Sequence, residues 1–144
     1  MGPVFCVHEF EADGMNIRNV LDDLENPVQV TGDWFVDALL VRWVPDEERE
    51  DIVEHLRMVR SRVGPDSPPP LLLGAALIWA EAAYHLRERA RAEKPLQSII
   101  ETLLSVDPFK PTEAAFEVLF NGLLDLFTPY QVSWYPAEQI WRVR

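Results

Sequence analysis

The residues able to do nucleophilic or acid–base chemistry are few and scattered. The chain contains one cysteine, Cys6, and three histidines, His8, His55 and His85. None has a partner at zinc-ligand spacing, and neither a nucleophile elbow nor a glycine-rich phosphate loop is present. An active site would have to assemble from separated residues such as Cys6, His8, Glu9 and His85. We therefore expect no cofactor, no metal and a protein that is not an enzyme.

Two of these residues have simple structural explanations. Glu81 lies one helical turn before His85, and such pairs are most often contacts on a helix surface, which we expect here. Cys6 lies between Phe5 and Val7, a setting typical of a buried strand cysteine with an unreactive thiol.

Acidic residues are the main chemical feature of the first third of the chain. Residues 1–54 hold fourteen Asp and Glu and three Arg, so they carry the whole net charge of −11. This charge repels nucleic acid and anionic lipid and favours a basic protein surface. Five acids between Asp46 and Asp51 suit the solvated start of a helix, but they lack the spacing of a calcium loop. Asp46, Glu47 and Glu50 are our acidic candidates for binding a protein partner.

The last fifteen residues, 130–144, are rich in the side chains that dominate protein interfaces. Two interpretations stay open. The segment is either a partner-docking tail or a final strand that returns to residues 4–10 and places Trp134 and Trp141 in the core. The candidates for partner binding in this segment are Trp134, Tyr135, Trp141, Arg142 and Arg144.

The patterning predicts an α+β fold, mostly helical, with a small antiparallel sheet. Residues 4–10 favour a strand, and residues 16–24 favour a short helix that ends before Pro27. The alternation near 28–44, with a turn at Thr31-Gly32-Asp33, predicts a hairpin. Asp33 could equally cap a helix through Trp34, Asp37, Leu40 and Val41.

The second half of the pattern is more regular. The segment from Pro45 to Val63 has proline and acids at its start, arginines near its end and a stripe at Ile52, Leu56, Val59 and Val63, which predicts a helix. After a proline-rich loop at 64–70, we expect helices over 71–94, 95–106 and 112–127, the last capped by Thr112 and burying Phe120 and Leu123.

The length of 144 residues suits one domain over residues 1–144. The lone cysteine and the lack of a signal-peptide pattern predict a cytosolic protein, and no apolar run reaches the length of a membrane span. In size, charge and composition the chain resembles small acidic phage-encoded regulators, such as those by which phages of thermophiles bind host RNA polymerase. Antitoxins, immunity proteins and anti-CRISPR proteins share this character. The resemblance involves no motif and transfers no residue; it implies a larger protein partner with a basic surface, such as RNA polymerase.

Overall fold

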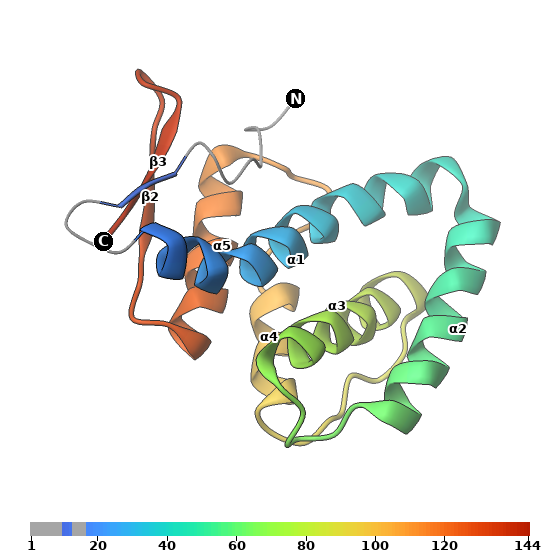
Figure 1. Cartoon of the computed structure of the whole chain (residues 1–144). Coiled ribbons are helices and arrows are strands. Elements are labelled where there is room, and N and C mark those ends of the chain that lie inside the picture. Colours follow the sequence, from blue (N-terminus) through green and yellow to red (C-terminus); the bar gives the residue numbers. More distant parts are fainter. Residues whose placement is uncertain (1–9, 13–16) are drawn as a thin grey trace.

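The computed structural model describes residues 10–12 and 17–144 (Figure 1). The described part confirms the predicted α+β class, with mostly helical structure and a small sheet. The elements in chain order are β1 (Phe10–Ala12), α1 (Ile17–Trp43), α2 (Pro45–Arg62), α3 (Pro69–Leu86), α4 (Leu96–Leu104), α5 (Glu113–Phe127), β2 (Val132–Tyr135) and β3 (Ile140–Val143).

Helix α1 overturns the hairpin predicted near 28–44. The helix is continuous from Ile17 to Trp43 and includes Pro27, where we expected it to end. An interior proline lacks a backbone donor and crowds the preceding turn, a cost that burial along the helix outweighs here. The buried Thr31 hydroxyl donates to the Pro27 carbonyl oxygen at 2.7 Å. Burial decided the outcome, because the apolar residues of this segment follow the helical repeat rather than strand alternation: Val20, Leu24, Val28, Trp34, Phe35, Ala38 and Val41 are buried. The helical alternative through Trp34 is the correct one.

The other helices lie close to their predicted ranges, with one shortened. Helix α3 ends at Leu86, well before Lys94, and Arg87 adopts a left-handed conformation with φ of 61°. Residues 87–94 are all charged except for two alanines, so they offer no apolar stripe for a packed helix. In α5 the Thr112 cap is confirmed, since its hydroxyl accepts from the Ala115 N–H at 3.1 Å.

Helix α3 lies at the centre of the helical part. It packs against α1, α2 and α4, while α5 packs against α1, α4 and β2 (Figure 1). Helix α2 lies at the edge of the molecule and covers a small cluster made by Val41, Ile52, Leu56 and Ala82. Within the described ranges, no helix has the length and apolar character needed to cross a membrane.

The sheet places the C-terminal segment against α5. Its strand order is β1-β3-β2, with β3 parallel to β1 and antiparallel to β2. The predicted return of the C-terminal segment to the N-terminal strand is therefore found at residues 10–12, and residues 4–9 lie outside the described residues. The Asn121 side chain joins α5 to β2, because it donates to the Val132 carbonyl at 2.9 Å and accepts from the Val132 N–H at 2.7 Å.

Candidate functional site

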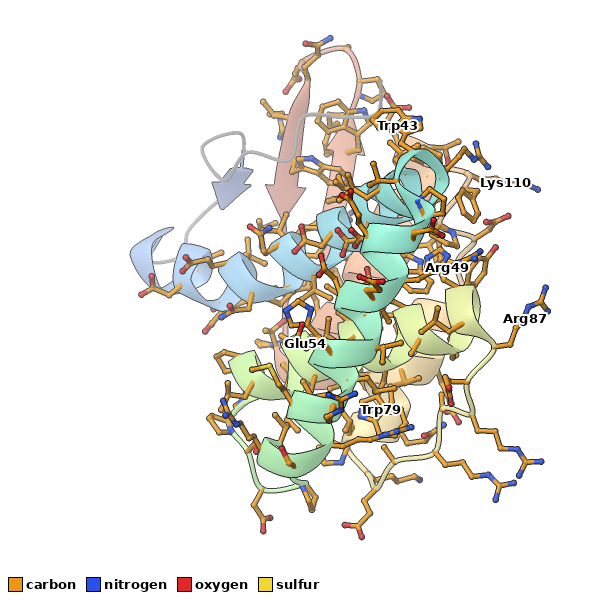
Figure 2. The ribbon with its side chains drawn as sticks, turned by 90° about the vertical axis from the view of Figure 1, so that its right-hand side faces the viewer. Trp43, Arg49, Glu54, Trp79, Arg87 and Lys110 are labelled. Atoms are coloured by element: carbon orange, nitrogen blue, oxygen red, sulfur yellow. The ribbon has the colours of Figure 1, made fainter. Side chains whose placement is uncertain are left out.

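The junction of α1 and α2 exposes an unusual amount of apolar surface. Trp43, the last residue of α1, is 71% exposed, and Val36 and Val44 are also exposed. Val36, the half-buried Leu40 and Trp43 are spaced i, i+4, i+7, so they share one side of the helix. We call Val36, Leu40, Trp43 and Val44 the corner strip. Trp43 lies beside the N-terminal end of α2 (Figure 2).

The backbone explains why Trp43 ends at a corner. Val44 leaves helical geometry, with φ of −133° and ψ of 63°, and Pro45 then starts α2 with its fixed φ. The neighbouring Arg42 is directed elsewhere, since its guanidinium lies 4.5 Å from the centre of the Phe109 ring. The chain thus turns abruptly between two helices, and within the described residues no helix or strand covers Trp43 at the turn.

Acidic residues, with Arg49 among them, follow this strip in the chain. Asp46 and Glu47 are exposed in the first turn of α2, followed by the exposed Glu50 and Asp51. The positive end of the helix dipole stabilises carboxylates there, which gives these acids a structural role as well. These acids nevertheless give an exposed tryptophan a negatively charged neighbourhood. The sequence pattern alone did not single out Trp43. The available signal was a large aromatic residue two positions before a helix-starting proline.

The carboxylates are crowded on the side of α2 that meets α1. The pKa of Glu48 is raised, first by partial burial and then by the charges of Asp37 and Asp51. The pKa of Asp33 is raised by partial burial and by Asp37, against the lowering effect of its hydrogen bond from Gln29. The negative charge near the corner therefore extends from α2 onto α1.

A buried acid lies beneath this crowded surface. Glu81 of α3 is 1% exposed, and one of its oxygens, Oε2, has no hydrogen-bond partner among the described residues. Burial, a hydrogen bond to Asp37 and the negative charges of Asp37, Glu48 and Asp33 raise its pKa well above the usual value. Glu81 is therefore held in its neutral, protonated form over a wider pH range than an ordinary glutamate.

The expectation that Glu81 and His85 form a surface contact is wrong. Glu81 is buried, and the His85 ring lies among aromatic rings, 5.0 Å from Tyr84, 5.7 Å from Phe109 and 6.5 Å from Trp34 between centroids. Burial lowers the pKa of His85, which favours the neutral imidazole. The sequence signal for the buried acid was its isolation, since Glu81 is the one charged residue between Leu71 and Tyr84.

The C-terminal candidates are mostly engaged within the fold. Trp141 is 1% exposed and contacts Trp134, with ring centroids 5.1 Å apart, so the core-strand interpretation fits both residues and the docking role assigned to Trp141 is corrected. Arg142 forms an ion pair with Glu138 at 2.9 Å and lies over the Tyr135 ring. Arg144 donates to the Ser133 hydroxyl at 2.8 Å. The ring of Tyr135 is the most exposed aromatic surface of this segment.

The scattered residues considered for catalysis are not brought together within the described part. Cys6, His8 and Glu9 lie outside the described residues, and His55 is exposed on α2. Across residues 10–12 and 17–144, no group of three or more His, Cys, Asp or Glu side chains is arranged to hold a metal ion. Comparison of the chain with protein-family models, with curated proteins and with solved structures found no match.

Proposed function

We propose that the protein is a non-enzymatic regulator or inhibitor that binds a larger protein through the corner strip. The observation that supports this most directly is the exposure of Trp43. The other four tryptophans of the chain are buried or partly buried in packed clusters. Leaving a large indole in water forgoes the stabilisation that its burial would bring, and tryptophan is the residue type most enriched among the anchors of protein interfaces.

The surrounding charge specifies the kind of partner. Asp46, Glu47 and Glu50 lie within seven residues of Trp43 and are all exposed. Carboxylates around an apolar anchor suit a partner whose own apolar pocket has a basic rim, since complementary charges steer encounter and fix orientation. Proteins that bind nucleic acid have such surfaces, and host RNA polymerase is the candidate that the compositional resemblance suggests.

The experiment compares capture by wild-type chain with capture by two variants. Trp43→Ala removes the anchor, while Val118→Ala changes an equally exposed apolar side chain on α5, far along the chain from the corner. Immobilised wild type and Val118→Ala should retain the same partner from lysate, and Trp43→Ala should lose it. Purified RNA polymerase is tested in the same format. A partner retained equally by all three chains would contradict docking at the corner strip.

The role of charge is measured separately from the role of the anchor. With the purified partner, the association rate should fall as salt rises, and Glu47→Arg should slow association with little change in dissociation. A random DNA duplex should not bind tightly at physiological salt, because the net charge opposes counterion release. An association rate independent of salt would remove the steering argument while leaving the anchor in place.

A further inference from the structure

One side of α2 carries opposite charges at its two ends. Asp46, Glu50, Val53, Arg57 and Arg60 are spaced i, i+4, i+7, i+11 and i+14, which places them on one side of a helix. All five are exposed, and Val53 in the middle is 46% exposed. We call these five residues the α2 side face. Its acids lie in the N-terminal half of the helix and its arginines in the C-terminal half.

This face is hollowed along its length. Two adjoining shallow hollows, of about 380 Å³ and 390 Å³, share Val53 and Arg57 and together reach from Glu50 to Arg60; we call them the groove. Leu56 and Leu86 contribute to the apolar part of its lining. Arg60 is held beside the groove because its guanidinium lies 4.8 Å from the centre of the Trp79 ring. Helix α2 lies at the front of the molecule in Figure 2, where Arg49 and Glu54 are labelled along it.

We propose that a second copy of this chain occupies the groove, with the two α2 helices packed antiparallel about a two-fold axis near Val53. Helix α2 runs from Pro45 to Arg62, so its midpoint lies next to Val53. Glu50 and Arg57 are equally distant from that midpoint. An antiparallel arrangement therefore sets Glu50 of each copy opposite Arg57 of the other, and two-fold symmetry forms this pair twice.

The remaining charges fit the same arrangement. Asp46 of one copy comes close to Arg60 of the other, because the two residues lie at nearly equal distances on either side of the midpoint. The exposed Val53 side chains meet at the axis and are removed from water. A uniformly basic partner would instead meet Arg57 and Arg60, and a uniformly acidic one would meet Asp46 and Glu50. A partner with the same division of charge, packed in the opposite direction, pairs both the acids and the arginines of this face.

The size of the face sets the expected strength. An 18-residue helix is about 27 Å long, so a single helix pair lies at the small end of specific interfaces. We expect a weak dimer that dissociates as ionic strength rises, because its charged pairs lie at the rim and are screened by salt. This inference goes beyond the proposed function: it shares Asp46 and Glu50 with the surroundings of the corner strip, but it does not involve Trp43.

Charge reversal tests the antiparallel register. Sedimentation equilibrium should show that Glu50→Arg and Arg57→Glu each weaken dimerisation by about tenfold, since each substitution converts two attractive pairs into two repulsive ones. The double variant Glu50→Arg/Arg57→Glu should restore dimerisation, because the exchanged charges again face each other. Trp43→Ala should dimerise like wild type. Wild-type chain that stays monomeric at its highest soluble concentration, or single variants that dimerise normally, would overturn the proposal.

A cross-link tests the position of the axis without depending on affinity. In a Cys6→Ser background, Val53→Cys should form an intermolecular disulfide under mild oxidation, because the two residues meet at the axis. Met58→Cys is the matched control, since Met58 is similarly exposed but lies on another side of α2. Circular dichroism establishes that both variants are folded. Cross-linking through Met58 and not through Val53 would place the contact elsewhere and refute this interface.

Discussion

Trp141 and Trp43 are the same residue type in opposite surroundings. Trp141, in β3, is buried between α5 and the sheet, with its ring centroid 5.3 Å from that of Phe116 and 6.3 Å from that of Phe120. Trp43, at the end of α1, is exposed beside a group of acids. The difference shows that aromatic content does not by itself locate a binding surface. An aromatic side chain is available for binding only where no other helix or strand covers it.

The truncation of residues 134–144 should have the largest effect. It removes β3 and the second half of β2, leaves β1 without its partner strand and deletes two indoles that pack against the core. Loss of one buried tryptophan costs about 3 to 5 kcal/mol, a large share of the stability of a domain of this size. We expect the truncated chain to unfold or aggregate, as measured by circular dichroism and light scattering. A truncated chain that melts like wild type would show that Trp141, unlike a core residue, contributes little to stability, and the contrast with Trp43 would not hold.

Substitution in α5 sharpens the account of the buried region. Phe120→Ala and Leu123→Ala should each lower the free energy of unfolding by about 2 to 5 kcal/mol, because both side chains are fully buried. Leu126→Ala is the control on the same helix, where the side chain is exposed and the change should stay within about 0.5 kcal/mol. Urea denaturation measures all three. Equal midpoints for buried and exposed positions would disprove the placement of this helix.

The buried acid beneath the corner should make stability depend on pH. Because the pKa of Glu81 is raised in the folded protein, its contribution is full below the unfolded-state value and is lost as pH rises through the folded-state value. Asp33, Asp37, Glu48, Arg49 and His85 are the charged or titratable groups that act on this site. Glu81→Gln keeps a neutral donor for Asp37, so it should melt at a higher temperature than wild type in neutral and alkaline buffer.

Melting temperatures from pH 4 to pH 9 give the measurement, and the two curves should converge toward the acidic end. Glu88→Gln serves as the control, since Glu88 is exposed just after α3. If Glu81→Gln and Glu88→Gln changed the pH profile alike, the effect would come from net charge and not from burial of Glu81.

The smallest expected effect on stability is that of Trp43→Ala. Because the indole is 71% exposed, its removal should change the free energy of unfolding by at most about 0.5 kcal/mol. Urea denaturation beside the binding assay is the measurement. A loss of stability comparable to that of Phe120→Ala would show that Trp43 packs within the fold, and the corner strip would then lose its support as a docking surface.

Much of the helical framework could be predicted because local signals agreed with burial. Proline and acids at the start of α2, the Thr112 cap and the apolar repeat around Phe120 all point to the same elements. The prediction for the segment around Pro27 was wrong because its local signals disagreed with burial. Its β-branched residues and its proline favour strands and breaks locally, but burial of Trp34, whose ring N–H donates to the Val106 carbonyl at 2.9 Å, favours the helix.

The candidate site was less predictable than the fold. Asp46, Glu47 and Glu50 were identified from charge density, which is a property of sequence. The exposure of Trp43 and the burial of Glu81 depend on which elements pack over them, and the hydrophobic repeat of the sequence does not show this packing. For the same reason the aromatic C-terminal segment fitted both a tail and a strand until the pairing of β3 with β1 and β2 was known.

The uninterrupted course of α1 also has a mechanical consequence. Trp34 is fixed at the core by its bond to Val106, and it divides the helix into a long arm toward the sheet and a short arm toward the corner. At about 1.5 Å per residue, these arms measure about 26 Å from Trp34 to Ile17 and about 14 Å from Trp34 to Trp43. A helix that pivots as a rigid rod about Trp34 reverses a displacement of Trp43 and roughly doubles it at Ile17. A small shift at Trp43 would therefore reach the end of the helix near the sheet enlarged and in the opposite direction.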